Sequence, residues 1–310
     1  MRVAVIDVGS NSIKLLVADG APGQAPLEVA SRTLEVRISQ GLASDRPHLS
    51  IDGMERGIGA ISTLATEARV RGADKIIAVA TSAVRDASNG QEFHDRARTD
   101  AGIELRILGG LEEAELIGLG ITTDPALLDL RDFRMFDLGG GSLECLSFKD
   151  RNVTFATSLP LGCVRLTEMF LETPSAPLAS ADARKIASHV KASLLAAGVP
   201  LPVPRGTRVI GTGGTLTTLR AMSAAKRDIP LGQAEGELTV PLIRQTLKDV
   251  GSVGLDARKL VPGLSPQRAD VFPTALATLL ALAELGEFEA FRHSFRNLRW
   301  GVAAELLSSS

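Results

Sequence analysis

Acidic, glycine and hydroxyl residues meet in one stretch of the sequence, from Phe136 to Glu144. An apolar run ends at Asp137, three glycines and Ser142 follow, and Glu144 opens a second alternating run. Glycines permit a turn in which bare backbone N–H groups approach a ligand closely. Carboxylates beside such a turn suit a divalent cation that carries a phosphate, because hard cations take oxygen ligands. Taken alone, this stretch is equally typical of a plain hairpin.

The same plan occurs near the start of the chain, in the segment from Val5 to Ser12. An apolar run again leads into an aspartate, Asp7, which a glycine and two hydroxyl residues follow. Asp7 and Asp137 lie 130 residues apart. That interval is too long for a solenoid repeat, but it fits one domain-sized unit followed by a second. The second copy therefore favours a ligand-binding role for both turns.

Apolar patterns predict an ordered series of elements around the first turn. We expect strands at 2–7, 13–18 and 27–38, a helix capped by Ser50, a strand at 75–80, a polar helix containing His94 and a short strand within 101–108. Three strands, a helix, a strand, a helix and a strand form the order of a ribonuclease-H-like unit. Gly110 should open a further helix, in which Glu112 and Glu113 lie in the first turn.

The second half of the chain predicts a comparable set. Expected strands are 133–137, 143–148, 152–159 and the run ending at Gly211; expected helices are about 163–171, 180–197, from Leu216, 241–250 and 271–286, with a loop at 228–237. The fold class is therefore α/β, with two units and no low-complexity linker between them.

The composition of this 310-residue chain limits the classes of partner that it is expected to bind. A net charge of −2 and an aromatic content of 4% without tyrosine exclude a nucleic-acid platform. No apolar run reaches the roughly 20 residues needed to span a bilayer. We therefore expect a soluble cytoplasmic protein, with no nucleic-acid polymer and no membrane as partner. The four histidines, flanked by polar sequence, are expected at the surface, and both cysteines in buried, inert positions.

Assembled in order, these motifs resemble the Ppx/GppA family of exopolyphosphatases and guanosine pentaphosphate phosphohydrolases, over nearly the whole chain. They are D-V-G-S-N-S from Asp7, T-S-A-V-R ending at Arg85, G-L-E-E-A from Gly110, D-L-G-G-G-S from Asp137, L-P-L-G from Leu159 and G-T-G-G-T from Gly211. The first motif alone is weak, since sugar kinases, actin and chaperone ATPases share a similar one. The combination is specific.

The resemblance implies the duplicated ribonuclease-H-like fold of the acetate kinase–actin–chaperone superfamily (an actin-like ATPase fold), with the ligand in a cleft between two domains. The expected domains are 1–120 and 121–296, and a C-terminal helix at about 297–310 is expected to pack back onto the first, with Trp300 in its contact. The chain ends at Ser310, so it resembles a short form without the C-terminal helical extension of longer members.

The resemblance also implies roles for individual residues. Glu113, the second acid of G-L-E-E-A, corresponds to the base that activates water, and Arg85 to an arginine that contacts phosphate. Mg²⁺ would be held by Asp7, Asp137 and Glu144, directly or through its waters. Expected phosphate-binding residues are Gly9, Ser10, Asn11, Ser12, Gly139, Gly140, Gly141, Ser142, Gly213, Gly214 and Thr215. For Arg85 a surface salt bridge with Asp86 or a helix acid stays open.

The implied activity is Mg²⁺-dependent hydrolysis of terminal phosphoanhydride bonds of inorganic polyphosphate. Guanosine pentaphosphate (pppGpp) is the alternative substrate. A homodimer is the oligomeric state that the sequence leaves open. Two other classes compete: an ATP-dependent kinase of the same superfamily, and a weakly catalytic polyphosphate or nucleotide sensor. The sensor gains support where the chain departs from the family pattern. Leu143 replaces a threonine, and the Ala234–Gly236 loop has an acid and lacks a histidine. Separately from this support, Asn297 replaces a glycine.

Overall fold

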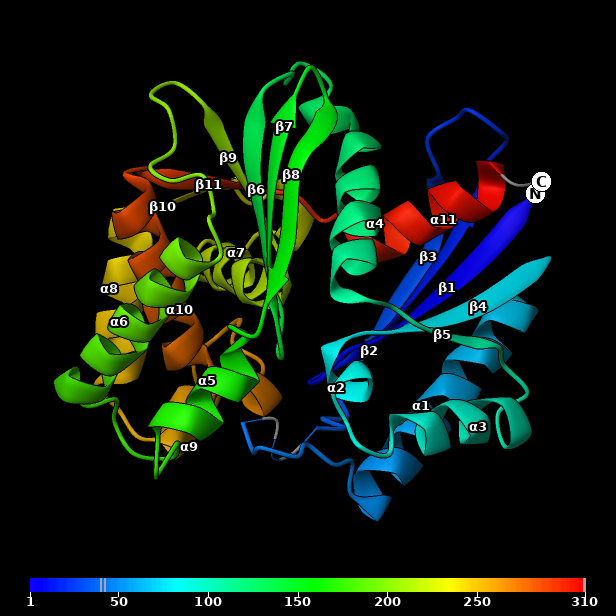
Figure 1. The fold of residues 1–310 in the computed structure, drawn as a ribbon, viewed down its shortest axis with the longest axis horizontal. Helices are drawn as coiled ribbons and strands as arrows, with labels where there is room; N and C mark the ends of the chain where they lie inside the picture. The colour runs from blue at the N-terminus through cyan, green and yellow to red at the C-terminus, as the bar shows by residue number, and fades with distance from the viewer. Residues whose placement is uncertain (40, 42, 309–310) are drawn as a thin grey trace. The chain divides into compact units, whose positions relative to one another are not determined.

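Contacts divide the chain into two units in the computed structural model, which describes residues 1–39, 41 and 43–308 (Figure 1). Unit 1 is Met1–Asp129 together with the C-terminal segment from Arg296, and unit 2 is Leu130–Phe295. The boundary expected at 120/121 would cut helix α4 (Gly110–Thr122), whereas the observed division leaves that helix whole.

Unit 1 is built on a five-stranded sheet with the strand order β3-β2-β1-β4-β5. Its elements are β1 Arg2–Val8, β2 Ile13–Asp19, β3 Leu27–Leu34, α1 Ile51–Val70, β4 Lys75–Ala80, α2 Ser82–Arg85, α3 Gly90–Thr99, β5 Leu105–Ile107, α4, the 3₁₀ turn Pro125–Leu127 and α11 Leu298–Ser308. β1 is antiparallel to β2 and parallel to β4, which is parallel to β5. This is the series expected of a ribonuclease-H-like unit.

Helices cover both faces of this sheet, with α1 and α3 on one side and α4 and α11 on the other (Figure 1). α1 begins where predicted, because the Ser50 side chain accepts a hydrogen bond from Gly53 N at 3.0 Å. Its buried face carries apolar residues at helical spacing, Ile58, Ile61 and Leu64, against β1 and β2. The interior strand β1 is buried along Val3–Ile6, as expected of a strand with helices on both faces.

Unit 2 repeats the plan with a six-stranded sheet in the order β10-β11-β9-β6-β7-β8. Its elements are β6 Phe133–Leu138, β7 Leu143–Lys149, β8 Asn152–Leu159, α5 Cys163–Phe170, α6 Ser180–Ala196, β9 Arg208–Thr212, α7 Gly214–Lys226, β10 Glu237–Thr239, α8 Val240–Gly251, α9 Leu255–Lys259, α10 Phe272–Gly286 and β11 Ala290–His293, with 3₁₀ turns at Leu231–Gln233 and Pro266–Arg268. The Ala- and Leu-rich α10 is almost wholly buried and packs against α6 and α8.

Several element bounds differ from the sequence prediction. β3 ends at Leu34 rather than 38, because the backbone beyond it turns at Arg37 (φ 37°) and bonds to the first glycine turn. β5 is only Leu105–Ile107. α7 starts at Gly214, two residues before the predicted start. β10 begins at Glu237, inside the segment predicted as loop. In the described part of the chain no helix has the length and apolarity to cross a membrane.

Candidate active site

The two glycine turns adopt the same backbone arrangement, one in each unit. Gly9 N donates to Ser12 O at 3.1 Å between β1 and β2, and Gly139 N donates to Ser142 O at 3.0 Å between β6 and β7. Each turn follows the carboxyl end of a strand that has one parallel neighbour, β4 beside β1 and β9 beside β6. Ligands in α/β sheets bind at this edge.

The carbonyl groups of the second turn are held by helix α5. Cys163 N donates to Gly139 O at 3.0 Å, Val164 N to Gly140 O at 2.8 Å, and Arg165 Nε to Gly141 O at 3.0 Å. Because carbonyl and N–H point in opposite directions across a peptide, the N–H groups of this turn face away from α5. They form a preorganised concave set of donors suited to an anion.

The first turn is held in the same way by the segment after β3. Ser39 Oγ donates to Ser10 O at 3.0 Å, and Arg37 donates through its N–H to Asn11 O and through Nε to Asn11 Oδ1. Ser10 Oγ and Asn11 Nδ2 are buried, and within the described residues they have no hydrogen-bond partner. Buried donors without a partner are costly, so this pair fits a ligand oxygen.

In unit 2, a row of oxygen-bearing side chains crosses four neighbouring strands at one level. Sheet register pairs Ser158 with Glu144, Glu144 with Asp137, and Asp137 with Thr212. Residues directly opposite on adjacent strands share a face. Ser158 Oγ donates to Glu144 Oε1 at 2.7 Å. Asp137 and Glu144 are 6% and 1% exposed, so two carboxyl groups lie on adjacent strands away from water.

The corresponding row in unit 1 has the opposite chemistry. Asp7 pairs in register with Lys14, and Lys14 Nζ lies 3.8 Å from Asp7 Oδ2. Unit 1 thus carries its own cation where unit 2 carries a second carboxylate.

The donor set of unit 2 fits Mg²⁺. The described residues contain no cluster of three or more His, Cys, Asp or Glu that would form a metal centre from protein alone. Mg²⁺ uses one or two carboxylates and keeps several waters, and Asp137 and Glu144 supply that number. Thr212 Oγ1 beside them is buried and lacks a hydrogen-bond partner among the described groups. A water bound to the cation would supply such a partner.

Glu113 and Arg85 form a partly buried ion pair in unit 1. Arg85 Nη1 lies 2.7 Å from Glu113 Oε2, and it also donates to Leu108 O at 3.1 Å. The Glu113 side chain is 6% exposed and that of Arg85 22%. Arg85 Nε additionally contacts Asp86 at 3.4 Å, so the salt bridge that sequence left open exists alongside the pair with Glu113.

Glu112 has a different role from its neighbour. Its carboxylate accepts from Gly109 N at 3.0 Å, which caps α4, and from Arg106 Nε at 2.9 Å. Burial raises the pKa of Glu112, but the bonds from Arg106 and Gly109 outweigh burial and leave the pKa below its ordinary value. Of the two adjacent acids, Glu113 is buried and Glu112 serves the helix terminus.

The residues of unit 1 gather at one sheet edge. Val8, Ala80 and Ile107 are register partners at the ends of three adjacent parallel strands. The segments that follow them are the first glycine turn, the stretch leading to Arg85 and the start of α4 with Glu113.

The third glycine motif lies against the second turn in unit 2. Gly213 has φ 100°, and a Cβ there would overlap Leu138 O and lie 2.7 Å from Asp137 Oδ1. Gly214 and Thr215 are the first residues of α7, whose N-terminus is the positive end of a helix dipole. Gly213 is thus placed beside Asp137, and Gly214 and Thr215 follow it at the start of the helix.

A model of the Ppx/GppA phosphatase family matches residues 16–310. The chain belongs to this family. Exopolyphosphatase 1 of Mycobacterium tuberculosis is 30% identical over 270 residues, which cover 87% of this chain and 77% of that protein. Exopolyphosphatase 1 of Mycobacterium leprae is 30% identical over 275 residues, 87% of this chain and 78% of that protein. Membership confirms the expected class of enzyme, a hydrolase of phosphoanhydrides.

Solved structures confirm the two-unit α/β fold. An exopolyphosphatase from Cytophaga hutchinsonii has a TM-score of 0.89 at 24% identity, covering 100% of this chain and 98% of that one. The PPX-GPPA enzyme of Aquifex aeolicus has a TM-score of 0.79 at 26% identity, covering 98% and 99%.

One departure from the family pattern, Leu143, has a structural explanation. Leu143 is the first residue of β7, pairs with Leu138 and is 0% exposed, so its side chain belongs to the core rather than to the phosphate turn.

The expectation that His293 lies at the surface is wrong. It ends β11, is 6% exposed, and its backbone N–H donates to Gly236 O at 2.7 Å, beside the loop that lacks the family histidine.

Sequence reasoning missed four polar residues of these sites: Ser158, Arg165, Thr212 and His293. Thr212 lies within the G-T-G-G-T motif, so the motif itself was a signal. The other three come from segments whose local patterns reveal nothing of the partner strand or turn.

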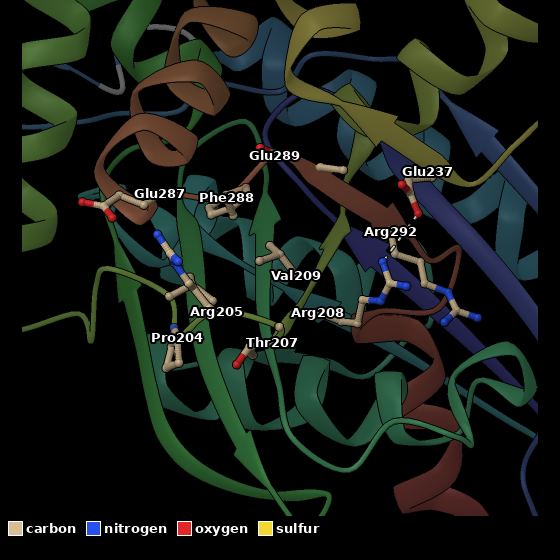
Figure 2. Close-up of a pocket in the computed structure, with 13 residues that line it drawn as sticks. Pro204, Arg205, Thr207, Arg208, Val209, Glu237, Glu287, Phe288, Glu289 and Arg292 are labelled. Carbon is tan, nitrogen blue, oxygen red and sulfur yellow. Dashed lines mark ion pairs between the residues drawn. The ribbon is translucent and has the colours of Figure 1, made fainter.

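A separate pocket of about 520 Å³ opens in unit 2 at the amino ends of β9 and β11 (Figure 2). Arg208, Arg292 and Glu237 lie together on one side of it, and Arg205 and Glu287 on the other. Arg208 Nη1 is 3.7 Å from Glu237 Oε2. The glycine motif follows the opposite end of β9, a strand length of roughly 13 Å away. The pocket contains no predicted site residue.

Proposed function

We propose that this chain hydrolyses the terminal phosphoanhydride bond of inorganic polyphosphate in a Mg²⁺-dependent reaction. The observation that carries the proposal is the pair of matching glycine turns, whose carbonyls are tied back so that their N–H groups point outward. Such turns recognise phosphate oxygens without reading a base or a sugar. The names of the 30%-identical relatives, both exopolyphosphatases, support polyphosphate as the substrate class.

In this proposal Glu113 accepts a proton from water as the water oxygen bonds to the terminal phosphorus. The bridging P–O bond breaks, and the electron pair leaves with the shortened chain. Arg85, 2.7 Å from Glu113, holds the carboxylate in place and supplies positive charge for phosphate oxygens. General base catalysis by a positioned carboxylate contributes about 10²- to 10⁴-fold.

The N–H groups of Ser10–Ser12 and Gly140–Ser142, with Gly213, Gly214 and Thr215, bind phosphate oxygens. Gly9 and Gly139 contribute by closing the turns, because their own N–H groups donate to Ser12 O and Ser142 O. Ser10 Oγ and Asn11 Nδ2 gain the hydrogen-bond partners that they lack. Asp137 and Glu144 would hold Mg²⁺, with Asp7 as a further candidate. A cation held there would neutralise charge on the phosphates and so lower the cost of bringing the polyanion beside carboxylates.

The test measures phosphate release from tripolyphosphate, long polyphosphate and pppGpp, with Mg²⁺ and with EDTA. Glu113→Gln should lower turnover by about 10²- to 10⁴-fold, whereas Glu112→Gln should stay near wild-type turnover. Equal effects of the two variants would remove Glu113 from its role. Faster phosphate release from pppGpp than from either polyphosphate would identify pppGpp as the preferred substrate. Binding of these compounds without phosphate release would favour a sensor. Transfer of ATP phosphate to an acceptor would favour a kinase.

A further inference from the structure

Unit 2 contains a chain of hydrogen bonds that ends at the third glycine motif. It runs through the buried His293 ring at the carboxyl end of β11. His293 Nδ1 lies 3.4 Å from Arg220 Nη1, and His293 Nε2 lies 3.2 Å from Thr217 Oγ1. Thr217 Oγ1 in turn donates to Gly213 O at 3.0 Å.

The chemistry of the end groups fixes the direction of every proton in this chain. An arginine guanidinium only donates, so His293 Nδ1 must accept and Nε2 must carry the hydrogen. His293 Nε2–H then donates to Thr217 Oγ1, whose own hydrogen is left for Gly213 O. Burial, followed by the charge of Arg220, lowers the pKa of His293 to about 3. The ring therefore stays neutral in the tautomer that this chain requires.

The far end of the chain is anchored by two groups, the Ala234 carbonyl and the Phe295 ring. Arg220 donates to Ala234 O through Nε at 3.0 Å and Nη2 at 2.6 Å. Its guanidinium lies 4.7 Å from the Phe295 ring centroid, and the His293 and Phe295 rings meet edge to face at 4.7 Å. The His293 ring thus lies between Arg220, Phe295 and Thr217.

The near end of the chain acts on the backbone beside Asp137. Gly213 O accepts from both the N–H and the hydroxyl of Thr217, at 3.1 and 3.0 Å. Fixing this carbonyl fixes the Gly213–Gly214 peptide plane, and hence the direction of the Gly214 N–H at the start of α7.

We propose that His293 is a positioning residue for the Gly213–Thr215 turn, acting through Thr217. The phosphate-binding role of that turn rests on the function proposed above. Without the bond from Nε2, the Thr217 hydroxyl can rotate away from Gly213 O and the turn loses one of its two tethers. The cost of phosphate binding would then include ordering the turn.

The test uses variants that separate the two ring nitrogens. His293→Phe keeps an aromatic ring but loses both bonds, and His293→Asn keeps an acceptor near Arg220 but falls short of Thr217. His293→Gln reaches Thr217 with an amide N–H. Thr217→Val removes the hydroxyl itself. His189→Phe is the matched control, because His189 in α6 also packs against a phenylalanine, Phe170, at 5.3 Å.

We expect KM for tripolyphosphate to rise by about 2- to 10-fold in His293→Phe, His293→Asn and Thr217→Val, the range set by one hydrogen bond. Turnover should stay within twofold, and His293→Gln should restore most of the affinity. The increases in KM caused by His293→Phe and Thr217→Val should not add in the double variant. A purely structural role would instead lower turnover through loss of folded enzyme and leave KM unchanged, a result that overturns the proposal.

Calorimetric binding of tripolyphosphate and amide hydrogen exchange at residues 213–217 complete the experiment. If the wild-type protein binds tripolyphosphate without turnover, the proposed hydrolase activity is rejected. The dissociation constants of the variants still test the positioning role of His293, because a positioning role predicts weaker binding in His293→Phe. If wild type does not bind, faster exchange at 213–217 in His293→Phe, but not in His189→Phe or His293→Gln, supports the positioning role. Unchanged exchange rejects it.

Discussion

At the scale of single residues, the duplicated turns differ in the charge type of one cross-strand partner. Both place an aspartate at the end of the leading strand, but the cross-strand partner is Lys14 in unit 1 and Glu144 in unit 2. Two buried carboxylates placed opposite each other on adjacent strands repel when both are ionised, and Ser158 Oγ donates a hydrogen bond to one of them, Glu144. A divalent cation would relieve that repulsion.

We therefore expect Mg²⁺ to stabilise unit 2. At 100 times its dissociation constant, a ligand of the folded state adds about 2.7 kcal/mol to the free energy of unfolding. Glu144→Gln and Asp137→Asn should remove most of the Mg²⁺-induced rise in Tm, measured against EDTA in thermal unfolding. Asp7→Asn should remove less, because Asp7 already faces Lys14. A larger loss in Asp7→Asn than in Glu144→Gln would move the cation to unit 1.

His293 gives a second prediction, on the pH dependence of stability. Its pKa is about 3 in the folded chain and near 6.5 when unfolded. Between these values the unfolded chain binds a proton that the folded chain excludes, so the free energy of unfolding falls as pH drops from about 6.5 towards 3. One such group contributes a slope of up to about 1.4 kcal/mol per pH unit.

His293→Gln should flatten this part of the profile, because glutamine keeps a hydrogen bond but does not titrate. Urea unfolding at a series of pH values measures the difference between the two proteins. Carboxylates contribute equally to both, and so cancel. Parallel profiles for wild type and His293→Gln would show that His293 is not held neutral by the fold.

These residues also mark the limit of sequence reasoning about the site. The motifs located Asp137, Gly213 and Glu113, since a strand end, a glycine or a pair of acids is a local signal. Ser158 and His293 carry no such signal. They come within reach of the site only through the register of β8 and β11, which depends on contacts between segments far apart in sequence.

At the scale of elements, the candidate residues of each unit lie where parallel strands end and a turn or helix begins. This explains why α7 needs glycine at its start. Gly213 has φ 100°, and a side chain would run into Leu138 O and the Asp137 carboxylate. The element therefore requires both an unusual backbone conformation and the absence of a side chain.

Gly213→Ala should destabilise the chain by roughly 1–3 kcal/mol from backbone strain, with a further penalty from the overlap, and should raise KM for tripolyphosphate. Gly198→Ala is the control, since Gly198 has φ 64° and an added Cβ there would meet nothing within 4 Å. Denaturant unfolding should show a smaller loss for Gly198→Ala and an unchanged KM. Equal losses in stability and affinity would mean that overlap at Gly213 plays no part.

Most elements could be predicted because their apolar periods are long. α1, β4, α4, the strands β6–β8 and the helices α6, α8 and α10 lie within a few residues of the expected positions. The elements that the sequence did not predict are short. α2 has four residues and β10 three, too few to show a period, and β11 of four residues was not distinguished from the segment after α10.

At the scale of the whole molecule, the chain returns to unit 1 at its end, as the sequence predicted for the helix that contains Trp300. α11 packs on α4 and β1. The helices cross at Gly120 and Gly301, where a Cβ on Gly301 would overlap Leu116 O and one on Gly120 would overlap Asn297 O. Arg106 joins them further, through Glu112 on α4 and Glu305 on α11. Since α4 also carries Glu113, this crossing sets the position of the proposed base.

Gly301→Ala should therefore reduce both stability and activity. Overpacking of this kind costs roughly 1–3 kcal/mol, and relief by shifting α4 would displace Glu113 from Arg85. We expect faster amide exchange in α4 and α11, a lower Tm, and a fall in turnover with Mg²⁺ and tripolyphosphate. Gly59→Ala is the control in the same unit. Gly59 is a helical glycine in α1 with nothing within 4 Å of an added Cβ, so alanine should add about 0.5–1 kcal/mol of stability. If Gly301→Ala lost stability but kept full turnover, the α4–α11 crossing would hold the fold together without setting the position of Glu113.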